Sequence, residues 1–226
     1  MTKISLKKQI LDSNDAVAAT NRKLFDAHHI VAFNVMASPG AGKTSVILSL
    51  ASRLKPTHKV GVVEGDIASR IDTEKVIAAG YPAFQINTGG NCHLDAVMVQ
   101  KALSALPLDD IHILFVENVG NLICPANFNL GTHKNIVIAS VPEGSDKPYK
   151  YPGMFMKADI VILNKTDLMK AFDFDLAYFT HGIKILNDKA PIVLTSCKSK
   201  RGIRELANLV VDKYRKNFAN HNFESK

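Results

Sequence analysis

A glycine-rich stretch at residues 37–44, ASPGAGKT, constrains this chain more than any other part of it. An apolar run, residues 30–36, precedes the stretch, and a helical pattern, residues 45–54, follows it. This order predicts a strand, a loop and the start of a helix. Main-chain N–H groups of such a loop, together with the helix N-terminus, bind phosphate anions. The sequence therefore predicts a triphosphate-binding loop, with a tight turn lacking a ligand as the alternative.

Each residue type within this loop has its own role in binding a triphosphate. Gly40 and Gly42 let the main chain approach the phosphates closely. Lys43 supplies a positive charge and is an expected catalytic residue, and the Thr44 hydroxyl is an expected Mg²⁺ ligand. Ala37 stands where such loops usually carry their first glycine. The phosphate-binding residues expected here are Gly40, Ala41, Gly42, Lys43, Thr44 and Ser45.

Composition limits the class of protein. The chain has 226 residues, of which 46% are hydrophobic, enough for one sizeable α/β domain with a helical extension. Its net charge of +7 comes from scattered basic residues, so we expect no nucleic-acid partner. No apolar run could span a membrane and no signal sequence is visible, which predicts a cytoplasmic protein. Three cysteines are an odd number, which favours metal ligation or burial over disulfides.

Apolar runs of strand length alternate with helical patterns along the rest of the chain. The expected strands are residues 30–36, 59–63, 83–87, 111–117, 135–141, 160–164 and 192–195. The helices expected between or after them are residues 45–54, 69–79, 93–106, 174–189 and 203–218. Continuously apolar strands with interleaved helices predict a mostly parallel seven-stranded sheet, covered on both faces, of the P-loop NTPase type.

An amphipathic pattern over residues 7–28 predicts an N-terminal helix, with a break near residues 13–15. The expected organisation is therefore a helical extension (1–29), a P-loop GTPase domain (30–218) and a tail (219–226).

Two carboxylates end expected strands. Asp66 ends the second strand, and Glu117 ends the fourth in a manner that resembles a Walker B element. Both are expected to hold Mg²⁺, directly or through water, and to be catalytic, while the Gly120 N–H is placed to sense a γ-phosphate. A carboxylate that only caps a helix is the alternative for each.

The identity of the base follows from residues 164–167, Asn-Lys-Thr-Asp, at the end of the sixth strand, which match the N-K-x-D guanine motif. The Asp167 carboxylate can accept hydrogen bonds from both N1–H and the 2-amino group of guanine, which adenine does not offer. The sequence Ser196-Cys197-Lys198 resembles the loop whose main-chain N–H groups bind guanine O6. Asn164, Lys165, Asp167, Ser196, Cys197 and Lys198 thus complete the expected nucleotide-binding set, and the nucleotide is expected to be GTP.

A second candidate site comprises Cys92, His93 and Cys124. Cys92 falls near the start of an expected helix, where the helix dipole favours a thiolate. Thiolate and imidazole ligands suit Ni²⁺ or Zn²⁺. A tetrahedral ion needs four ligands, and these residues supply three. Water, another residue or a second subunit in a homodimer must therefore supply the fourth ligand. Two buried cysteines and an unrelated histidine are the alternative.

Taken together, several segments resemble the hydrogenase nickel incorporation proteins of the HypB family. These segments are residues 64–66, 85–94, 117–125, 129–131, 142–152 and 164–167. The resemblance implies a SIMIBI-class GTPase that hydrolyses GTP to GDP with Mg²⁺ and assists nickel insertion into [NiFe]-hydrogenase. It also implies a GTP-dependent homodimer, a HypA-type accessory protein and the hydrogenase large-subunit precursor as partners. The family's interface metal site maps onto Cys92, His93 and Cys124.

The N-terminal cysteine-rich motif and histidine-rich stretch of some family members are absent from this sequence, which predicts no nickel storage here. The alternatives are a related GTPase chaperone for urease or a cobalamin enzyme, a nucleoside or sugar kinase, and a metal-binding module with a structural nucleotide. Our hypothesis of mechanism is that GTP with Mg²⁺ orders residues 66–72 and 117–124 and thereby assembles the Cys/His site in a dimer.

Overall fold

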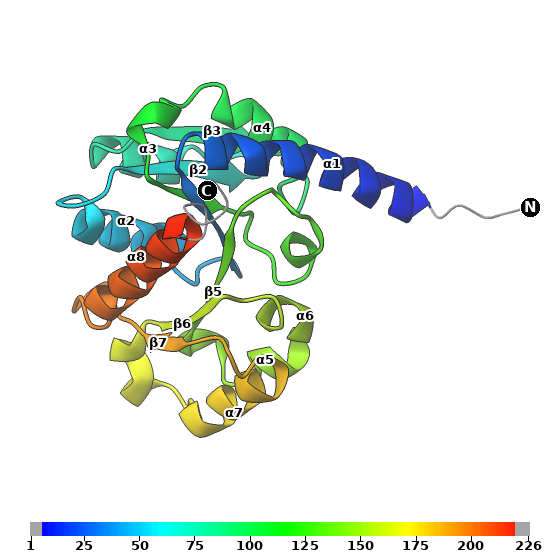
Figure 1. Cartoon of the computed structure of the whole chain (residues 1–226). Coiled ribbons are helices and arrows are strands. Elements are labelled where there is room, and N and C mark those ends of the chain that lie inside the picture. The colour runs from blue at the N-terminus through cyan, green and yellow to red at the C-terminus, as the bar shows by residue number, and fades with distance from the viewer. Residues whose placement is uncertain (1–5, 220–226) are drawn as a thin grey trace, which may run out of the picture.

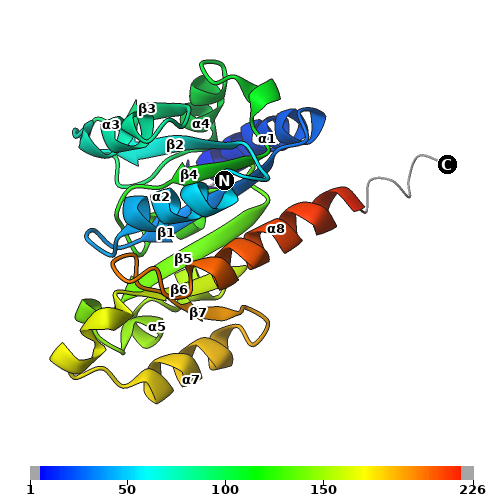
Figure 2. The ribbon, with the colours of Figure 1, turned by 90° about the vertical axis from the view of Figure 1, so that its left-hand side faces the viewer.

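The predicted fold class is confirmed by the computed structural model, which describes residues 6–219. Seven strands form one sheet in the order β3-β2-β4-β1-β5-β6-β7, and all neighbouring strands pair in parallel (Figures 1 and 2). The strands are β1 (Val31–Ala37), β2 (Val60–Asp66), β3 (Ala83–Asn87), β4 (Ile113–Glu117), β5 (Lys134–Ser140), β6 (Ile160–Asn164) and β7 (Ile192–Leu194). The segments that follow the strands therefore meet at one edge.

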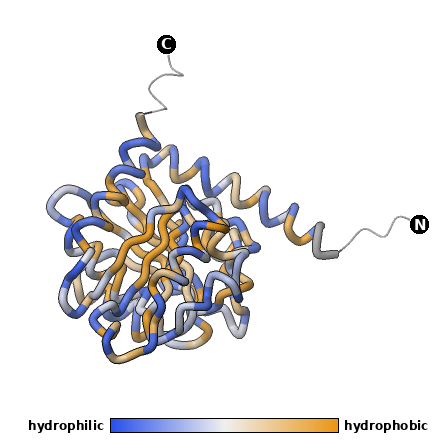
Figure 3. Tube along the Cα trace, turned by 90° about the horizontal axis from the view of Figure 1, so that it is seen from below, coloured by the Kyte–Doolittle hydropathy of each residue, from blue (hydrophilic) through white to orange (hydrophobic). Residues whose placement is uncertain are grey.

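Helices cover both faces of the sheet because alternate strand residues point to opposite sides. Val31, Phe33 and Val35 of β1 join the core cluster that includes residues of α2 and α8, whereas Ala32 and Met36 join the clusters of the other face. Figure 3 shows the hydrophobic strands gathered in the middle of the molecule. The first face carries α2 (Lys43–Leu54), α3 (Ile71–Ala78) and α8 (Ile203–Ala219). The second carries α1 (Leu6–Ala27), α4 (Ala96–Leu103), α5 (Lys147–Lys150), α6 (Pro152–Phe155) and α7 (Leu176–Leu186).

Helix boundaries differ from the predicted ones where aspartates act as caps. Helix α4 begins at Ala96 rather than at 93 because the Asp95 carboxylate accepts the Met98 N–H at 2.7 Å. Helix α7 begins at Leu176 rather than at 174, since Asp175 accepts the Tyr178 N–H in the same way. Cys92 consequently lies just before the cap of α4, near the helix N-terminus but outside its first turn.

The predicted break in the first helix is also wrong, because α1 runs without interruption through residues 13–15. Asn14 there is buried and directs its side chain to other segments rather than to a cap. The short helices α5 and α6, each with a proline in its first turn, were not predicted. The part of the chain that the structure describes also has four 3₁₀ turns: η1 (Leu108–Asp110), η2 (Cys124–Asn127), η3 (Val141–Glu143) and η4 (Thr166–Ala171).

The division into extension, domain and tail stays a prediction, and the tail beyond residue 219 lies outside the described residues. Within residues 6–219, no helix has both the length and the apolar character that crossing a membrane requires.

Candidate functional site

The phosphate loop joins β1 to α2, and two of its glycines are needed for its shape. Gly40 and Gly42 have φ angles of +75° and +96°. A Cβ on Gly42 would lie 2.6 Å from Asn164 Nδ2, so no other residue fits there without displacing Asn164. Asn164 Nδ2 donates to the Ala41 carbonyl at 3.0 Å, and Lys165 Nζ donates to the Gly40 carbonyl at 2.6 Å. The expected base motif and the expected phosphate loop are thus in direct contact.

Thr44 and Glu117 form the candidate Mg²⁺ site. The Thr44 hydroxyl donates to Glu117 Oε1 at 2.9 Å, and Glu117 Oε2 is buried without a hydrogen-bond partner among the described residues. Burial raises the pKa of Glu117 to about 8, against the opposing charge of Lys43. A hydroxyl beside a buried carboxylate oxygen that lacks a partner is a donor set that fits Mg²⁺.

We expect protein prepared without nucleotide and Mg²⁺ to lose stability as the pH rises from 4.5 toward 8. Glu117 binds a proton in the folded state but not in the unfolded state over this window, so that the stabilisation is complete below 4.5 and is lost as the pH rises through about 8. The slope is at most about 1.4 kcal/mol per pH unit. Urea unfolding at several pH values across the window measures it.

The control for this prediction is Glu117→Gln, whose amide imitates the protonated carboxyl group. Its stability should vary less with pH than that of the wild type. Equal pH dependence of the two proteins would contradict the assignment of the effect to Glu117.

Other acidic side chains near the phosphate loop had no specific role in our sequence prediction. Glu64 lies opposite Glu117 in the pairing of β2 with β4, and burial raises its pKa despite a hydrogen bond from Thr73. Glu143 of η3 accepts hydrogen bonds from the hydroxyls of Ser38 and Ser140, so it anchors the start of the phosphate loop. Both glutamates fall in segments that carry the family resemblance, but the sequence does not show their contacts with segments far apart in the chain.

Asp66 has a different environment from the one we expected. Its Oδ1 accepts the N–H groups of Ala68 and Ser69 at 2.9 and 2.7 Å, which shapes the turn after β2. The pocket beside Lys43, Thr44 and Glu117 is lined on this side by Asp72 and Lys75. The magnesium role of Asp66 therefore stays a prediction.

The candidate guanine site is assembled from two loops. Asp167 accepts a hydrogen bond from the Ser196 hydroxyl at 2.6 Å, and this bond, with help from Lys198 and Lys165, lowers the pKa of Asp167. The carboxylate is therefore an acceptor at neutral pH. Cys197 contacts Asn164, with Sγ 3.8 Å from Oδ1, and belongs to no metal-binding group in the described part of the chain.

Gly120, the predicted γ-phosphate sensor, packs directly on the phosphate loop. A Cβ at Gly120 would lie 3.0 Å from the nitrogen of Pro39, so the two main chains are in close contact. The next residue, Asn121, donates its N–H to the Ala37 carbonyl at 2.9 Å. The segment after β4 is therefore attached to the loop that would hold the phosphates.

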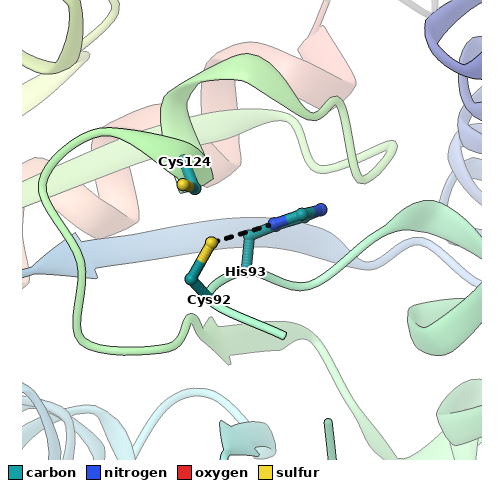
Figure 4. Close-up of side chains that lie close together, drawn as sticks. All are labelled: Cys92, His93 and Cys124. Carbon is teal, nitrogen blue, oxygen red and sulfur yellow. Dashed lines mark hydrogen bonds between the residues drawn. The ribbon is translucent and has the colours of Figure 1, made fainter. Parts of the chain in front are cut away.

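Cys92, His93 and Cys124 lie together, as Figure 4 shows, with Cys124 reaching the other two from a separate loop. One ligand atom from each lies within 4.8 Å of the others, and Cys92 Sγ is 3.6 Å from His93 Nδ1. His93 stacks on Phe128 with a centroid distance of 3.8 Å, and burial lowers the pKa of its imidazole. The hydrogen bond with Cys92, followed by burial, raises the pKa of Cys124. A neutral imidazole and two thiols that can lose protons form a donor set for a thiophilic divalent ion.

Two asparagines connect the metal-site residues to the nucleotide side. Asn121 Oδ1 accepts the N–H groups of Ile123 and Cys124 at 2.7 and 3.1 Å. Asn118, which is fully buried, accepts the N–H of Leu94 at 3.1 Å with its Oδ1 and donates its own main-chain N–H to the Val35 carbonyl. Displacement of the segment after β4 would therefore reach both Cys124 and the residue next to His93.

Comparison with known proteins adds independent evidence. The model of the CobW/HypB/UreG nucleotide-binding domain matches residues 31–194. The chain is 42% identical to the probable hydrogenase maturation factor HypB of Methanocaldococcus jannaschii over 207 residues, covering 92% of this chain and 94% of the relative. It is also 42% identical to HypB of Escherichia coli K12 over 205 residues, covering 91% of this chain and 71% of the relative.

A solved structure agrees with these sequence matches. The crystal structure of HypB from Helicobacter pylori in complex with nickel superposes with a TM-score of 0.87 at 39% identity, covering 91% of this chain and 96% of that one. An LAO/AO transport system kinase, at 16% identity and a TM-score of 0.57, shares the fold alone.

Proposed function

The chain belongs to the HypB branch of the CobW/HypB/UreG family, and from this membership we propose that it is a GTP-hydrolysing metallochaperone that assists nickel insertion into [NiFe]-hydrogenase. Nickel is the cargo of this activity rather than a resident cofactor. The observation that carries the proposal is the attachment of Asn121 to both the phosphate loop and Cys124. Through this contact, nucleotide state and metal binding can influence each other.

In the proposed reaction, the main chain of residues 40–45 and Lys43 hold the phosphates, while Asp167 and the loop of Ser196, Cys197 and Lys198 select guanine. Thr44 and Glu117 hold Mg²⁺, with Asp66 as a further candidate. Held by these residues, Mg²⁺ would supply positive charge to offset the charge that develops on the phosphates. Since Glu117 is the buried carboxylate beside Lys43, it must lose its proton to take this role.

A second copy of the chain is the proposed partner that completes the metal site. Three exposed isoleucines, Ile67, Ile71 and Ile123, follow the carboxyl ends of the adjacent strands β2 and β4, with exposures of 51%, 61% and 62%. An exposed apolar group beside an incomplete ligand set favours burial against another subunit. A HypA-type protein and the hydrogenase large-subunit precursor are the further proposed partners, and Zn²⁺ is an alternative ion.

The test is gel filtration of the purified full chain with GDP or a non-hydrolysable GTP analogue, each with and without nickel. We expect the analogue to shift the protein from monomer to dimer, and nickel to elute with the dimer. Phosphate release with and without Mg²⁺, measured on the same protein, tests hydrolysis. Identical elution in all four conditions and no phosphate release would refute the proposal.

A second candidate function is maturation of a different nickel enzyme. One relative, 39% identical over 225 residues, is the hydrogenase/urease maturation factor HypB of Helicobacter pylori. Loss of hydrogenase activity but not urease activity in a deletion strain would favour the first function over the second.

A further inference from the structure

Helix α1 packs on the rest of the protein through an unusual stripe of residues. Among residues 9–27, where the exposure of the side chains is described, the buried positions are Asn14, Ala18, Asn21 and Phe25, which recur at helical spacing on one face. Two of these four are asparagines, with exposures of 6% and 0%. Because a helix that only needs a packing surface gains most from apolar residues, buried amides here imply specific partners.

Both asparagines bind the same two segments of the chain. Asn14 Nδ2 donates to the Asn129 carbonyl at 2.8 Å, and its Oδ1 accepts the Ala96 N–H at 2.9 Å. Asn21 Nδ2 donates to the carbonyls of Ala96 and Leu130 at 2.8 and 3.1 Å. Each side chain therefore bridges the start of α4 to the loop between β4 and β5.

These two segments are the ones that carry the metal-site residues. Ala96 follows the pair Cys92 and His93 on the first segment, and Asn129 follows Cys124 on the second. Phe128, next to Asn129, stacks on His93 at 3.8 Å. A change in the spacing of the two segments would therefore alter the contact between Phe128 and His93.

The contact between α1 and the second segment leaves no room for a side chain at position 131. A Cβ at Gly131 would lie 2.4 Å from the Ala18 carbonyl, so the helix and the loop touch through their main chains. Arg22 adds hydrogen bonds to the carbonyls of Gly131 and Thr132, the first at 2.7 Å. Figure 1 shows α1 running alongside α4. The helix is thus fixed to both segments at several points.

We propose that α1 is the element that sets the separation between the Cys92–His93 segment and Cys124, with Asn14 and Asn21 as positioning residues of the metal site. The inference rests on the proposed function in one respect, that these three side chains bind nickel. It goes beyond that function because it gives the N-terminal helix a role. The competing interpretation is that the asparagines only satisfy main-chain groups and stabilise the fold.

The test compares Asn14→Ala with a matched variant, Asn187→Ala. Asn187 makes the same kinds of bonds, donating to the carbonyls of Phe155 and Ala158 and accepting the Ala190 N–H, but it contacts neither ligand segment. Asn14→Asp serves as a conservative variant, since it keeps the acceptor for Ala96 N–H and loses the donor to Asn129. Urea unfolding of all variants shows whether the two alanine substitutions cost similar stability.

The first measurement needs no metal. Dibromobimane becomes fluorescent when it joins two neighbouring thiols, and it should link Cys92 to Cys124 in the full chain, where their sulfur atoms lie within 4.8 Å. We expect this linkage to be about tenfold slower in Asn14→Ala, intermediate in Asn14→Asp and unchanged in Asn187→Ala. Mass spectrometry of the fluorescent peptides identifies the linked pair. If Asn14→Ala does not fold, the comparison of Asn14→Asp with Asn187→Ala decides the question.

The second measurement is titration with Ni²⁺ alone, followed by thiolate-to-nickel absorption. We expect Asn14→Ala to lower nickel affinity by about 10- to 100-fold, the usual range for residues that orient metal ligands. Equal linkage rates in Asn14→Ala and Asn187→Ala would overturn the inference, whatever the nickel affinities of the two variants are. Nickel binding by Cys124→Ala that equals the wild type would instead overturn the metal site of the proposed function.

Discussion

Replacement of Asp167 by Asn is expected to weaken GTP binding by about 100-fold or more. The carboxylate is held toward the base site by the Ser196 hydroxyl at 2.6 Å, and its lowered pKa keeps it ionised at neutral pH. An ionised carboxylate can accept both the N1–H and the 2-amino hydrogen of guanine, and such charge-assisted bonds are about twice as strong as neutral ones. An amide at this position accepts only one of them and presents its own N–H₂ to the other. Isothermal titration with GDP and with a GTP analogue measures the loss.

Two comparisons make this prediction specific. Xanthosine diphosphate has a carbonyl where guanine has its 2-amino group, so Asp167→Asn should bind it better than the wild type does. Asp175→Asn makes the same change of charge at the cap of α7, away from the nucleotide site, and should bind GDP as the wild type does. Equal GDP affinity of Asp167→Asn and the wild type would remove the guanine assignment.

The sheet could be predicted from the sequence because its strands are short, mostly apolar runs, and the central ones are buried on both faces. The seven strands were placed within a few residues of their observed bounds, and the motifs at their ends meet at one edge as expected. What the pattern could not provide is the order of the strands and the contacts between loops. The bond from Asn164 to the Ala41 carbonyl joins residues 123 positions apart, and no local signal encodes it.

The protonation of Glu117 is a second feature that the sequence could not predict. An apolar run that ends in a carboxylate predicts a metal ligand, but the sequence does not show that Glu64 lies opposite it or that one oxygen lacks a partner. Both facts depend on tertiary burial, and burial is what raises the pKa of Glu117 to about 8.

The packing of helix α1 is a third feature that the sequence could not predict. Its hydrophobic residues suggested a packing face, yet Ile10 is 52% exposed and the buried stripe contains Asn14 and Asn21. Polar residues on a helix are ordinarily assigned to the solvent face. Only the position of the Ala96 peptide and the carbonyls of the loop after β4 explains their burial.

Replacement of Cys124 by Ala is expected to abolish nickel binding at the Cys/His site while leaving GTP affinity nearly unchanged. Cys124 is the only one of the three ligands that comes from the loop after β4, so its loss leaves Cys92 and His93, two adjacent residues that cannot enclose an ion by themselves. Cys124 is not one of the expected nucleotide-binding residues, and its main-chain N–H donates to Asn121 Oδ1, a bond that alanine preserves. Equilibrium dialysis with Ni²⁺ measures the stoichiometry, and titration with GDP measures the nucleotide affinity.

The matched control for Cys124→Ala is Cys197→Ala, which removes the remaining thiol of the three in the chain. Cys197 lies by Asn164 and outside the metal-binding group, so this variant should bind as much nickel as the wild type. Loss of nickel in Cys124→Ala but not in Cys197→Ala would show that position, rather than the number of thiols, determines binding. Unchanged stoichiometry in Cys124→Ala would show that the ion binds elsewhere, and the proposed coupling of nucleotide to metal through Asn121 would then have no metal ligand at its end.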